Sequence, residues 1–214
     1  MKLASIETFV VGNPPPGWGG RYFLFVKLTT ACGVVGYGEM YTASFGAHTV
    51  ARMAEDVFGK DLIDEDPFKI ERMWRRVYSR GYSSRPDISL MGVMSGLEMA
   101  CWDIIGKALD RPVHALIGGK LHERLRSYTY LYPDADMDQD SFYEDPDASA
   151  AMAARYVEEG FTAVKFDPAG AYTTVDPHMP ELEVIDRSAR FLKALREAVG
   201  TRADLLFGTH GQFS

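Results

Sequence analysis

The chain of 214 residues contains only two cysteines and no Cys-x-x-Cys pair. Cys32 falls in a strand-like stretch and Cys101 in a helix-like stretch, far apart along the chain. Zinc sites and disulfide frameworks need clustered or regularly paired cysteines. We therefore expect two buried free thiols rather than a disulfide or a zinc site.

Basic clusters and long apolar runs are also missing. The net charge of -7 is spread along the chain, which removes long-range attraction to nucleic acid or to an anionic membrane. The first residues, MKLASIETFVVG, lack the apolar core and cleavage site of a signal peptide, and no window approaches about twenty apolar residues. A hydrophobic content of 46% still supports a sizeable core. These features predict a cytoplasmic globular protein that acts on small molecules, without nucleic-acid or membrane partners.

The first forty residues read as three strands. Segments Lys2–Val11, Tyr22–Thr30 and Val34–Met40 are rich in β-branched and aromatic residues and predict a three-stranded antiparallel sheet. A tight turn over Thr30–Gly33 joins the last two strands. The proline- and glycine-rich stretch Asn13–Gly20 predicts a long loop, which suits a binding or lid element about as well as a plain surface loop.

Helical periodicity follows in three segments. Apolar residues recur every three or four positions over His48–Phe58, over Pro67–Tyr78, and from Ile88 to just before Arg111, where Pro112 ends the helix. Asp66 is predicted to cap the second helix, with proline in its first position. Small residues would let the third helix pack closely: Gly92, Ser95 and Gly96.

Beyond Gly118-Gly119 strand and helix patterns alternate. The predicted elements are a strand at Leu125–Tyr132, a helix at Pro146–Glu159, a strand at Thr162–Asp167, a helix at Glu181–Val199 and a strand at Ala203–His210. This alternation predicts parallel strands with crossover helices and a domain boundary near residue 120. Three parallel strands alone would leave an open edge and uncovered apolar faces, so we expect the sequence to be a piece of a longer protein.

Candidate functional residues collect at the predicted strand ends, where parallel α/β units carry their sites. They come in pairs spaced by two, so both members face the same side: Tyr130 with Tyr132, Lys165 with Asp167, and Gly208 with His210. Lys165 and Asp167 would form either a structural ion pair, or a site in which the lysine binds a carboxylate or enolate and the aspartate handles a proton or hydroxyl. His210, beside glycines, would be structural or catalytic.

Residues 88–128, ISLMGVMSGLEMACWDIIGKALDRPVHALIGGKLHERLRSY, resemble the cap-to-barrel junction of the mandelate racemase and muconate cycloisomerase branch of the enolase superfamily. The stretch VGYGE at 35–39 resembles the third strand of that cap. The similarity covers nearly the whole chain and looks closest to galactonate-dehydratase-like sugar-acid dehydratases. It implies an α+β capping domain over residues 1–120, followed by the first three β/α units of a TIM-like barrel over 121–214.

The resemblance also implies a chemistry. In that family a divalent metal, usually Mg²⁺, holds the substrate carboxylate, a base removes the α-proton, and the enolate expels a β-hydroxyl with help from a general acid. His210 matches the general acid, and Lys165 matches the first lysine of a Lys-x-Lys motif that contacts the substrate carboxylate. Further substrate contacts are predicted at the strand end and in two cap loops: Tyr132, Trp18, Arg21, Tyr41 and Phe45. Homo-oligomers are common in the family.

Two positions depart from the family pattern. The second lysine of the motif is Asp167, and the aspartate that serves as first metal ligand is Gly208. Asp204 lies too far along the strand to replace it. Either His210 joins the metal, or Asp167 moves in as a ligand, or metal binding is altered or lost. We therefore expect a sugar-acid dehydratase, and keep as alternatives a racemase or cycloisomerase, a non-catalytic sugar-acid-binding relative, or a cap-like interaction module.

Overall fold

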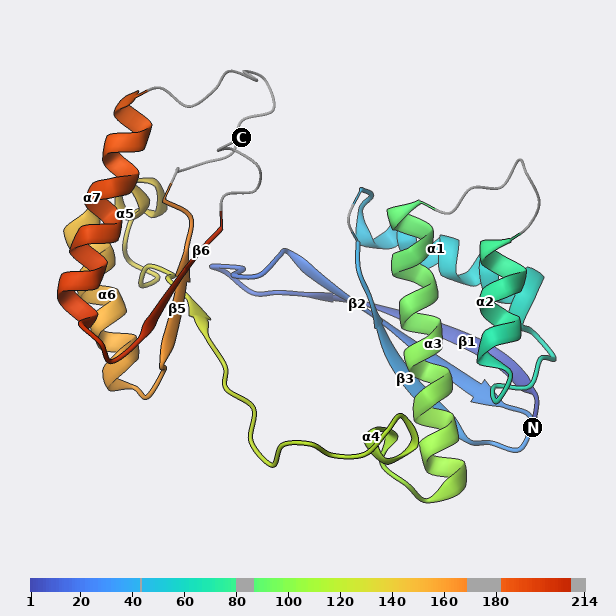
Figure 1. Cartoon of the computed structure of the whole chain (residues 1–214). Helices are drawn as coiled ribbons and strands as arrows, with labels where there is room; N and C mark the ends of the chain where they lie inside the picture. The colour runs from blue at the N-terminus through green and yellow to red at the C-terminus, as the bar shows by residue number, and fades with distance from the viewer. Residues whose placement is uncertain (43, 80–86, 169–181, 209–214) are drawn as a thin grey trace. The chain divides into compact units, whose positions relative to one another are not determined.

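The computed structural model describes residues 1–42, 44–79, 87–168 and 182–208. The chain forms two compact units, unit 1 over Met1–Leu121 and unit 2 over His122–Ser214. Figure 1 shows unit 1 in blue to green and unit 2 in yellow to red.

Unit 1 opens with the predicted antiparallel sheet. Its strands are β1 (Leu3–Gly12), β2 (Tyr22–Thr30) and β3 (Val35–Met40), in the order β1-β2-β3. On β2 every second side chain, from Leu24 to Thr30, is buried, while those between are only partly buried, as expected for a sheet covered on one face. The three-stranded antiparallel prediction is confirmed.

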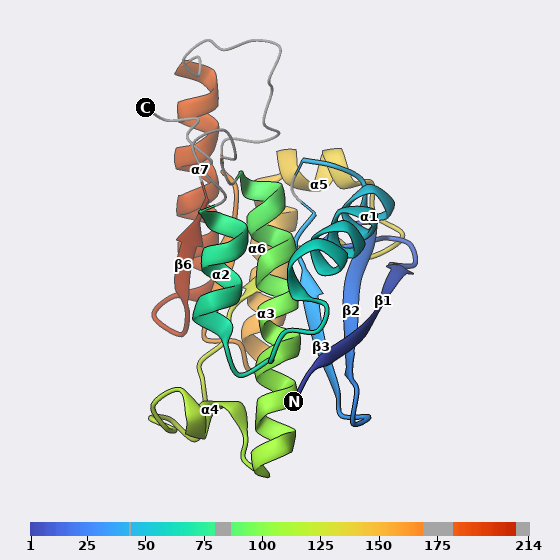
Figure 2. The same ribbon diagram turned by 90° about the vertical axis from the view of Figure 1, so that its right-hand side faces the viewer.

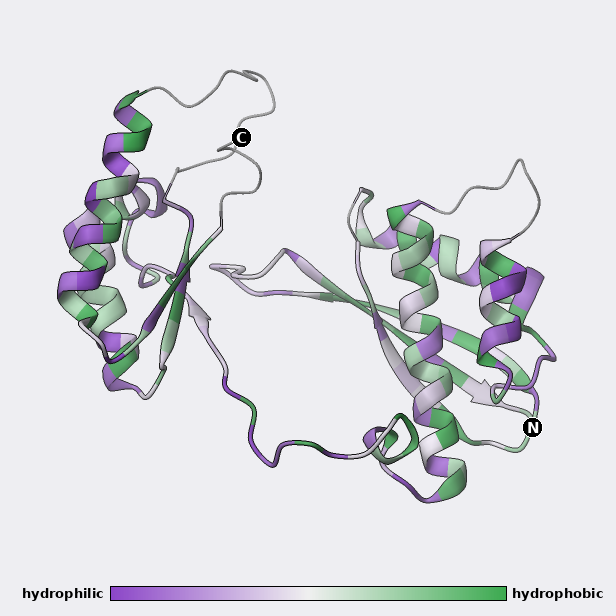
Figure 3. Ribbon diagram, in the orientation of Figure 1, coloured by the Kyte–Doolittle hydropathy of each residue, from purple (hydrophilic) through white to green (hydrophobic). Residues whose placement is uncertain are grey.

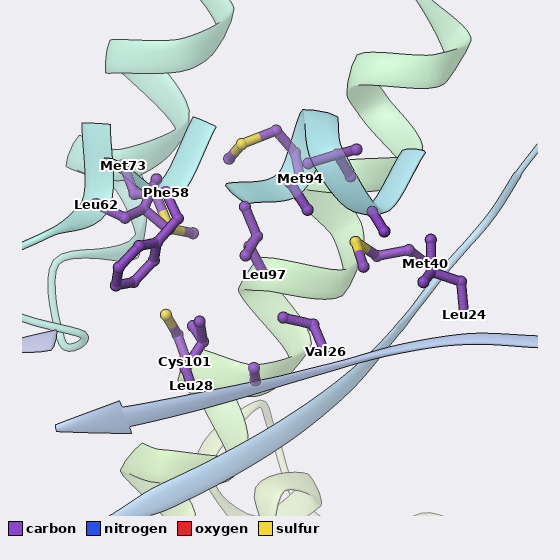
Figure 4. Close-up of a cluster of buried hydrophobic side chains, with 14 of the residues drawn as sticks. Leu24, Val26, Leu28, Met40, Phe58, Leu62, Met73, Met94, Leu97 and Cys101 are labelled. Atoms are coloured by element: carbon purple, nitrogen blue, oxygen red, sulfur yellow. The ribbon is translucent and has the colours of Figure 1, made fainter. Parts of the chain in front are cut away.

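Helices cover the buried face of this sheet. The helices that contact it are α1 (Ala47–Val57) and α3 (Ile88–Leu109). The π-helix η1 (Phe58–Leu62) and α2 (Ile70–Tyr78) pack against these helices, and a short α4 (Val113–Leu116) follows α3. In Figure 2 α3 lies between the sheet and α2. Figure 4 shows the resulting core, in which side chains from β2, η1 and α3 meet.

The long helix α3 packs against β3 almost backbone to backbone. A Cβ added at Gly38 would lie 2.9 Å from the carbonyl carbon of Gly96 and would overlap its oxygen. Gly96 on the helix is equally crowded, by Glu39 and Met40, so the predicted close packing is confirmed there, whereas Ser95 faces outward and is exposed. The contact requires glycine on both elements, because any side chain would force them apart.

The apolar character of α3 exceeds the expectation from the sequence. By length and composition the helix could cross a membrane, with mean hydropathy 1.4 over its most apolar window. The expectation that no segment is long and apolar enough to resemble a membrane-spanning helix is therefore wrong. Because 56% of that window is buried inside the protein, packing against the sheet accounts for its hydropathy.

Helix boundaries differ from prediction at Asp66. Its carboxylate accepts the backbone N–H of Phe68 at 3.2 Å and its carbonyl accepts that of Lys69 at 2.9 Å. These bonds close a separate turn over Pro67 and Phe68, and α2 begins only at Ile70. Asp66 therefore caps a turn rather than the predicted helix.

Unit 2 contains three parallel strands in the order β4-β5-β6. The strands are β4 (Thr129–Tyr130), β5 (Ala163–Phe166) and β6 (Asp204–Phe207), and the helices are α5 (Gln139–Glu144), α6 (Pro146–Glu158) and α7 (Leu182–Val199). Helices α6 and α7 pack side by side, and each mixes hydrophobic and hydrophilic residues (Figure 3). Strand, helix, strand, helix, strand is the predicted order, with α5 as an addition.

The first strand of unit 2 is much shorter than the predicted Leu125–Tyr132. Residues 121–128 are exposed, and Leu125 keeps 82% of its surface accessible. Arg126 instead holds this segment by donating from Nε to Oγ1 of Thr162 at 2.8 Å and pairing with Asp204 at 2.7 Å. Side-chain contacts therefore replace ladder hydrogen bonds before Thr129.

The two cysteines differ in environment. Cys101 is buried in the core of unit 1, as predicted, whereas Cys32 is exposed in the turn between β2 and β3. The expectation of a buried thiol is therefore wrong for Cys32, because its side chain points to solvent from the tight turn. Both thiols are free.

Candidate active site at the strand ends

Strand β5 separates its side chains between the core and the opposite face of the sheet. Val164 and Phe166 are buried in the core of unit 2, at 0% and 3% exposure. Successive side chains of a strand point to opposite faces, so Lys165 and Asp167 project away from that core, and both are partly buried. An ammonium and a carboxylate thus share one face at the carboxyl end of the strand.

Tyr130 reaches this pair from the neighbouring strand. It is the register partner of Lys165, and its hydroxyl donates to Oδ2 of Asp167 at 3.1 Å. Burial, and then the negative charge of Asp167, raise the pKa of Tyr130 well above its ordinary value. The phenol therefore stays protonated and acts as a hydrogen-bond donor to the carboxylate.

Two further tyrosines surround Tyr130. Its ring centroid lies 5.0 Å from that of Tyr132 and 6.2 Å from that of Tyr143. The Tyr143 hydroxyl donates to the carbonyl of Leu131 at 3.0 Å, and burial raises the pKa of Tyr143 to about 12. Tyr143 was missed because α5 was not predicted. The available signal was Asp138, whose side chain caps that helix.

Gly208 lies beneath the side chains of Lys165 and Asp167. Its backbone N–H donates to the carbonyl of Phe166 at 3.0 Å, which continues the β5–β6 ladder and places Gly208 beside Asp167. A Cβ at position 208 would overlap Oδ1 of Asp167 and would lie 3.4 Å from Cε of Lys165. Both side chains therefore use the space left by the glycine.

The capacity of this part of the structure to bind a metal ion is small. The described ranges contain no group of three His, Cys, Asp or Glu side chains that could hold a metal ion. Mg²⁺ takes about six oxygen ligands, several of them water. Asp167 provides one suitable carboxylate, so its position fits a single ligand, and the other ligands would come from water, substrate or residues outside the described part.

In unit 1, the predicted substrate contacts lie in two loops at the same end of the sheet. The amide of Asn13 ties the β1–β2 loop by donating to the carbonyls of Trp18 at 2.8 Å and Gly20 at 2.9 Å. Trp18 is half-buried, while Arg21 is exposed. The register partners Leu24 and Met40 bring the start of β2 beside the end of β3, where the second loop begins. That loop exposes the other two residues, Tyr41 at 67% and Phe45 at 53%.

The structure thus brings together three predicted residues of unit 2, Tyr132, Lys165 and Asp167, with Tyr130 as the link. The predicted general acid and tentative metal ligand His210 lies outside the described residues. The roles of all these side chains stay predictions.

The chain is similar to one protein-family model and to several characterised enzymes. Residues 18–118 match the family model described as "Mandelate racemase / muconate lactonizing enzyme, N-terminal domain". A D-gluconate/D-galactonate dehydratase of Picrophilus torridus is 30% identical over 99% of this chain and 51% of its own length. A D-xylonate dehydratase of Haloferax volcanii is 32% identical over 100% of this chain and 54% of its own length. The chain therefore spans about half the length of the curated relatives it matches.

Solved structures agree with this assignment. A crystal structure described as a mandelate racemase/muconate lactonizing enzyme from Labrenzia alexandrii is 63% identical, with a TM-score of 0.93 over 100% of this chain and 54% of the other. Another, from Sulfitobacter sp., is 54% identical, with a TM-score of 0.94 over 100% of this chain and 54% of the other. Residues 18–118 therefore belong to the N-terminal domain family of mandelate racemase and muconate lactonizing enzyme, in the enolase superfamily, and the chain as a whole is similar to galactonate-dehydratase-like relatives.

Proposed function

We propose that the full protein is a sugar-acid dehydratase that removes the proton α to a carboxylate and eliminates water. The observation that carries the proposal is the Lys165–Asp167–Tyr130 cluster at the ends of parallel strands, in a chain whose relatives are named as dehydratases of aldonates. An aldonate offers a carboxylate and several hydroxyls, which suits a site with both an ammonium and a carboxylate.

Each side chain has a task that matches its chemistry. The Lys165 ammonium would bind the substrate carboxylate and the negative charge that develops on it when the α-proton leaves. Asp167, held by Tyr130, would handle a proton or a hydroxyl group of the substrate, and His210 would donate the proton to the departing hydroxyl. A bound Mg²⁺ would supply further stabilisation of the enolate.

The remaining expectations complete the proposal. The proposed substrate contacts are Trp18, Arg21, Tyr41, Phe45 and Tyr132. We also propose a cytoplasmic homo-oligomer with a small-molecule substrate and no nucleic-acid or membrane partner. A capping domain over residues 1–120, followed by the first three β/α units of a TIM-like barrel over 121–214, belongs to the same proposal.

The test is turnover by the full protein with Mg²⁺ across a panel of aldonates and aldarates, including D-gluconate, D-galactonate and D-xylonate. We expect formation of a 2-keto-3-deoxy acid. Lys165→Met should lower kcat by about 100-fold or more, since it removes a cation from the developing charge, and His210→Ala should act similarly. Lys193→Met, at an exposed position of α7, is the matched control and should leave turnover unchanged.

The outcomes separate the alternatives. Exchange of the α-proton with solvent deuterium without loss of water would favour a racemase or cycloisomerase. Calorimetric binding of sugar acids without turnover would favour a non-catalytic relative. No turnover across a broad panel would contradict the dehydratase assignment.

A further inference from the structure

We infer that the free edge of strand β1 pairs with the same edge of a second copy of this chain, about a two-fold axis at Phe9. The inference builds on the proposed homo-oligomer and is independent of the dehydratase reaction. The two edges of the sheet in unit 1 differ in how their backbone groups are paired, and this difference carries the inference.

Side chains of α3 seal the edge of the sheet that β3 forms. Oδ2 of Asp103 accepts the backbone N–H of Tyr37 at 2.9 Å, and Nζ of Lys107 donates to the carbonyl of Val35 at 2.8 Å. The two side chains also pair with each other at 2.7 Å. These bonds occupy backbone groups through which another strand would add to the sheet. Figure 2 shows α3 beside β3 and β1 on the far side of the sheet.

The edge that β1 forms is paired only at its beginning. There the backbone of Leu3 donates to the carbonyl of Glu65 at 2.9 Å and accepts the N–H of Asp64 at 2.9 Å. At the other end the N–H of Asn13 donates to the carbonyl of Arg21 at 2.9 Å, and hydrogen-bonded pairs alternate along an antiparallel ladder, so the odd-numbered residues 5–13 bond toward β2. The backbone groups that point outward belong to residues 6, 8, 10 and 12, and no described residue forms a hydrogen bond to them.

This free stretch, residues 6–12, also lacks the features that keep an edge from pairing. Natural sheets protect their edges with lysine, proline or a β-bulge. Residues 6–12 contain neither lysine nor proline, and the register shift of β1 lies before them. Their only charge is on Glu7, which pairs with Lys27 at 2.5 Å. Beside it the side chains of Phe9 and Val11 are 40% and 45% exposed. The edge can therefore accept a further strand.

The free stretch is complementary to itself. Its centre is Phe9, so two antiparallel copies overlap over the whole stretch when Phe9 lies opposite Phe9 of the second copy. The outward groups of Thr8 then meet those of Val10 of the second copy, and both strands exchange hydrogen bonds along their length. A two-fold axis gives both copies the same contacts and needs no other component. The occupant that fits this edge is therefore a second copy of the chain.

Side chains on the open face of the sheet agree with this register. The two Phe9 rings meet across the axis, and aromatic pairs directly opposite each other stabilise a sheet. Glu7 lies opposite Val11 of the second copy, so the two carboxylates are kept apart and each retains its Lys27. The pairing therefore brings apolar side chains together without opposing like charges.

The experiment measures the molar mass of the full protein by sedimentation velocity over a range of concentrations. Thr8→Pro removes an outward N–H but leaves the β1–β2 ladder, which uses the odd-numbered residues. It should shift the protein to a smaller species and raise the Kd of the pairing by about 30-fold, as expected for two lost hydrogen bonds. Thr8→Val is the matched control. It keeps the N–H and loses the same hydroxyl, which donates to Glu55 at 3.3 Å, so it should leave the mass unchanged.

A cross-linking arm tests the register in a Cys32→Ser background. Phe9→Cys should give a disulfide-linked dimer under mild oxidation, because opposite residues of an antiparallel pair have Cβ atoms about 4.5 Å apart. Val11→Cys, which faces Glu7 of the second copy, should stay unlinked. Tyr37→Cys, 54% exposed on the sealed edge, is a second control. Circular dichroism verifies that each variant is folded. If Thr8→Pro unfolds, Phe9→Lys replaces it by placing two like charges across the axis.

The outcomes are distinct. A monomeric full protein would overturn both this inference and the proposed homo-oligomer, whatever its turnover. An oligomer whose mass is the same in Thr8→Pro and Phe9→Lys would show that another surface joins the copies, or that another part of the full chain covers β1, and would overturn this inference alone. Cross-linking through Val11 in place of Phe9 would refute the two-fold axis. A smaller Thr8→Pro variant that cross-links through Phe9 supports the inference, and its turnover is a separate measurement of the proposed function.

Discussion

Replacing Gly38 with alanine should destabilise unit 1 strongly, because β3 and α3 are separated by backbone alone at this point. The new Cβ would lie 2.9 Å from the carbonyl carbon of Gly96 and 3.1 Å from the backbone N of Ala100, and would overlap the Gly96 oxygen. These obstacles are helix backbone, which cannot rotate away as a side chain would. We expect the upper end of the cost of overpacking, about 3 kcal/mol of the free energy of unfolding.

The assay is urea unfolding followed by tryptophan fluorescence. All three tryptophans, Trp18, Trp74 and Trp102, lie in unit 1, so the signal reports on that unit. With a slope of about 2 kcal/mol per M, the loss lowers the midpoint by about 1.5 M. Gly12→Ala is the matched control, because Gly12 is also a sheet glycine and a Cβ there meets nothing within 4 Å. Equal midpoints for the two variants would refute the close-packing explanation.

Two further predictions concern the thiols and the start of α3. Iodoacetamide should label the exposed Cys32 in the folded protein and spare the buried Cys101. Burial raises the pKa of Cys101 to about 12, above the value of 9.0 for the unfolded chain. The contribution of the neutral thiol to the free energy of unfolding is therefore fully present below pH 9.0 and decreases as the pH rises toward 12. Labelling of both cysteines at equal rates would contradict this. Asp87→Ala should lower the free energy of unfolding by about 1 kcal/mol, because the carboxylate accepts hydrogen bonds from the backbone N–H groups of Ser89 and Leu90 at 2.9 Å. Asp87→Asn keeps a hydrogen-bond acceptor, so it should lower the free energy of unfolding by less in the same urea assay.

The sequence predicted those strands and helices that bury one face, because their buried residues recur at a regular spacing. The alternation on β2 and the three- to four-residue spacing on α3 are set by a single buried face, so composition alone reveals them. Prediction failed where side-chain hydrogen bonds override local propensity. The segment before Thr129 has strand-like residues, but Arg126 anchors it by its side chain, and Asp66 closes a turn in front of α2.

The candidate site was only partly readable for a related reason. Spacing by two correctly placed Lys165 and Asp167 on one face of a strand, since that follows from strand geometry. The bond from Tyr130 to Asp167 joins residues 37 positions apart, and the contact over Gly208 depends on the register of two strands. Neither has a local sequence signal, because register is a property of the assembled sheet.

Glycine is commonly taken as the absence of a functional group, and at position 208 the sequence alone supports that interpretation. The structure gives the glycine a positive role, because Asp167 and Lys165 both extend over its Cα and any side chain would displace them. The space above Gly208 is therefore shared by three positions, 165, 167 and 208, and a side chain at the last would displace those at the other two. A relative that carries a carboxylate at position 208 should then lack one at position 167, since the shared space admits a single carboxylate.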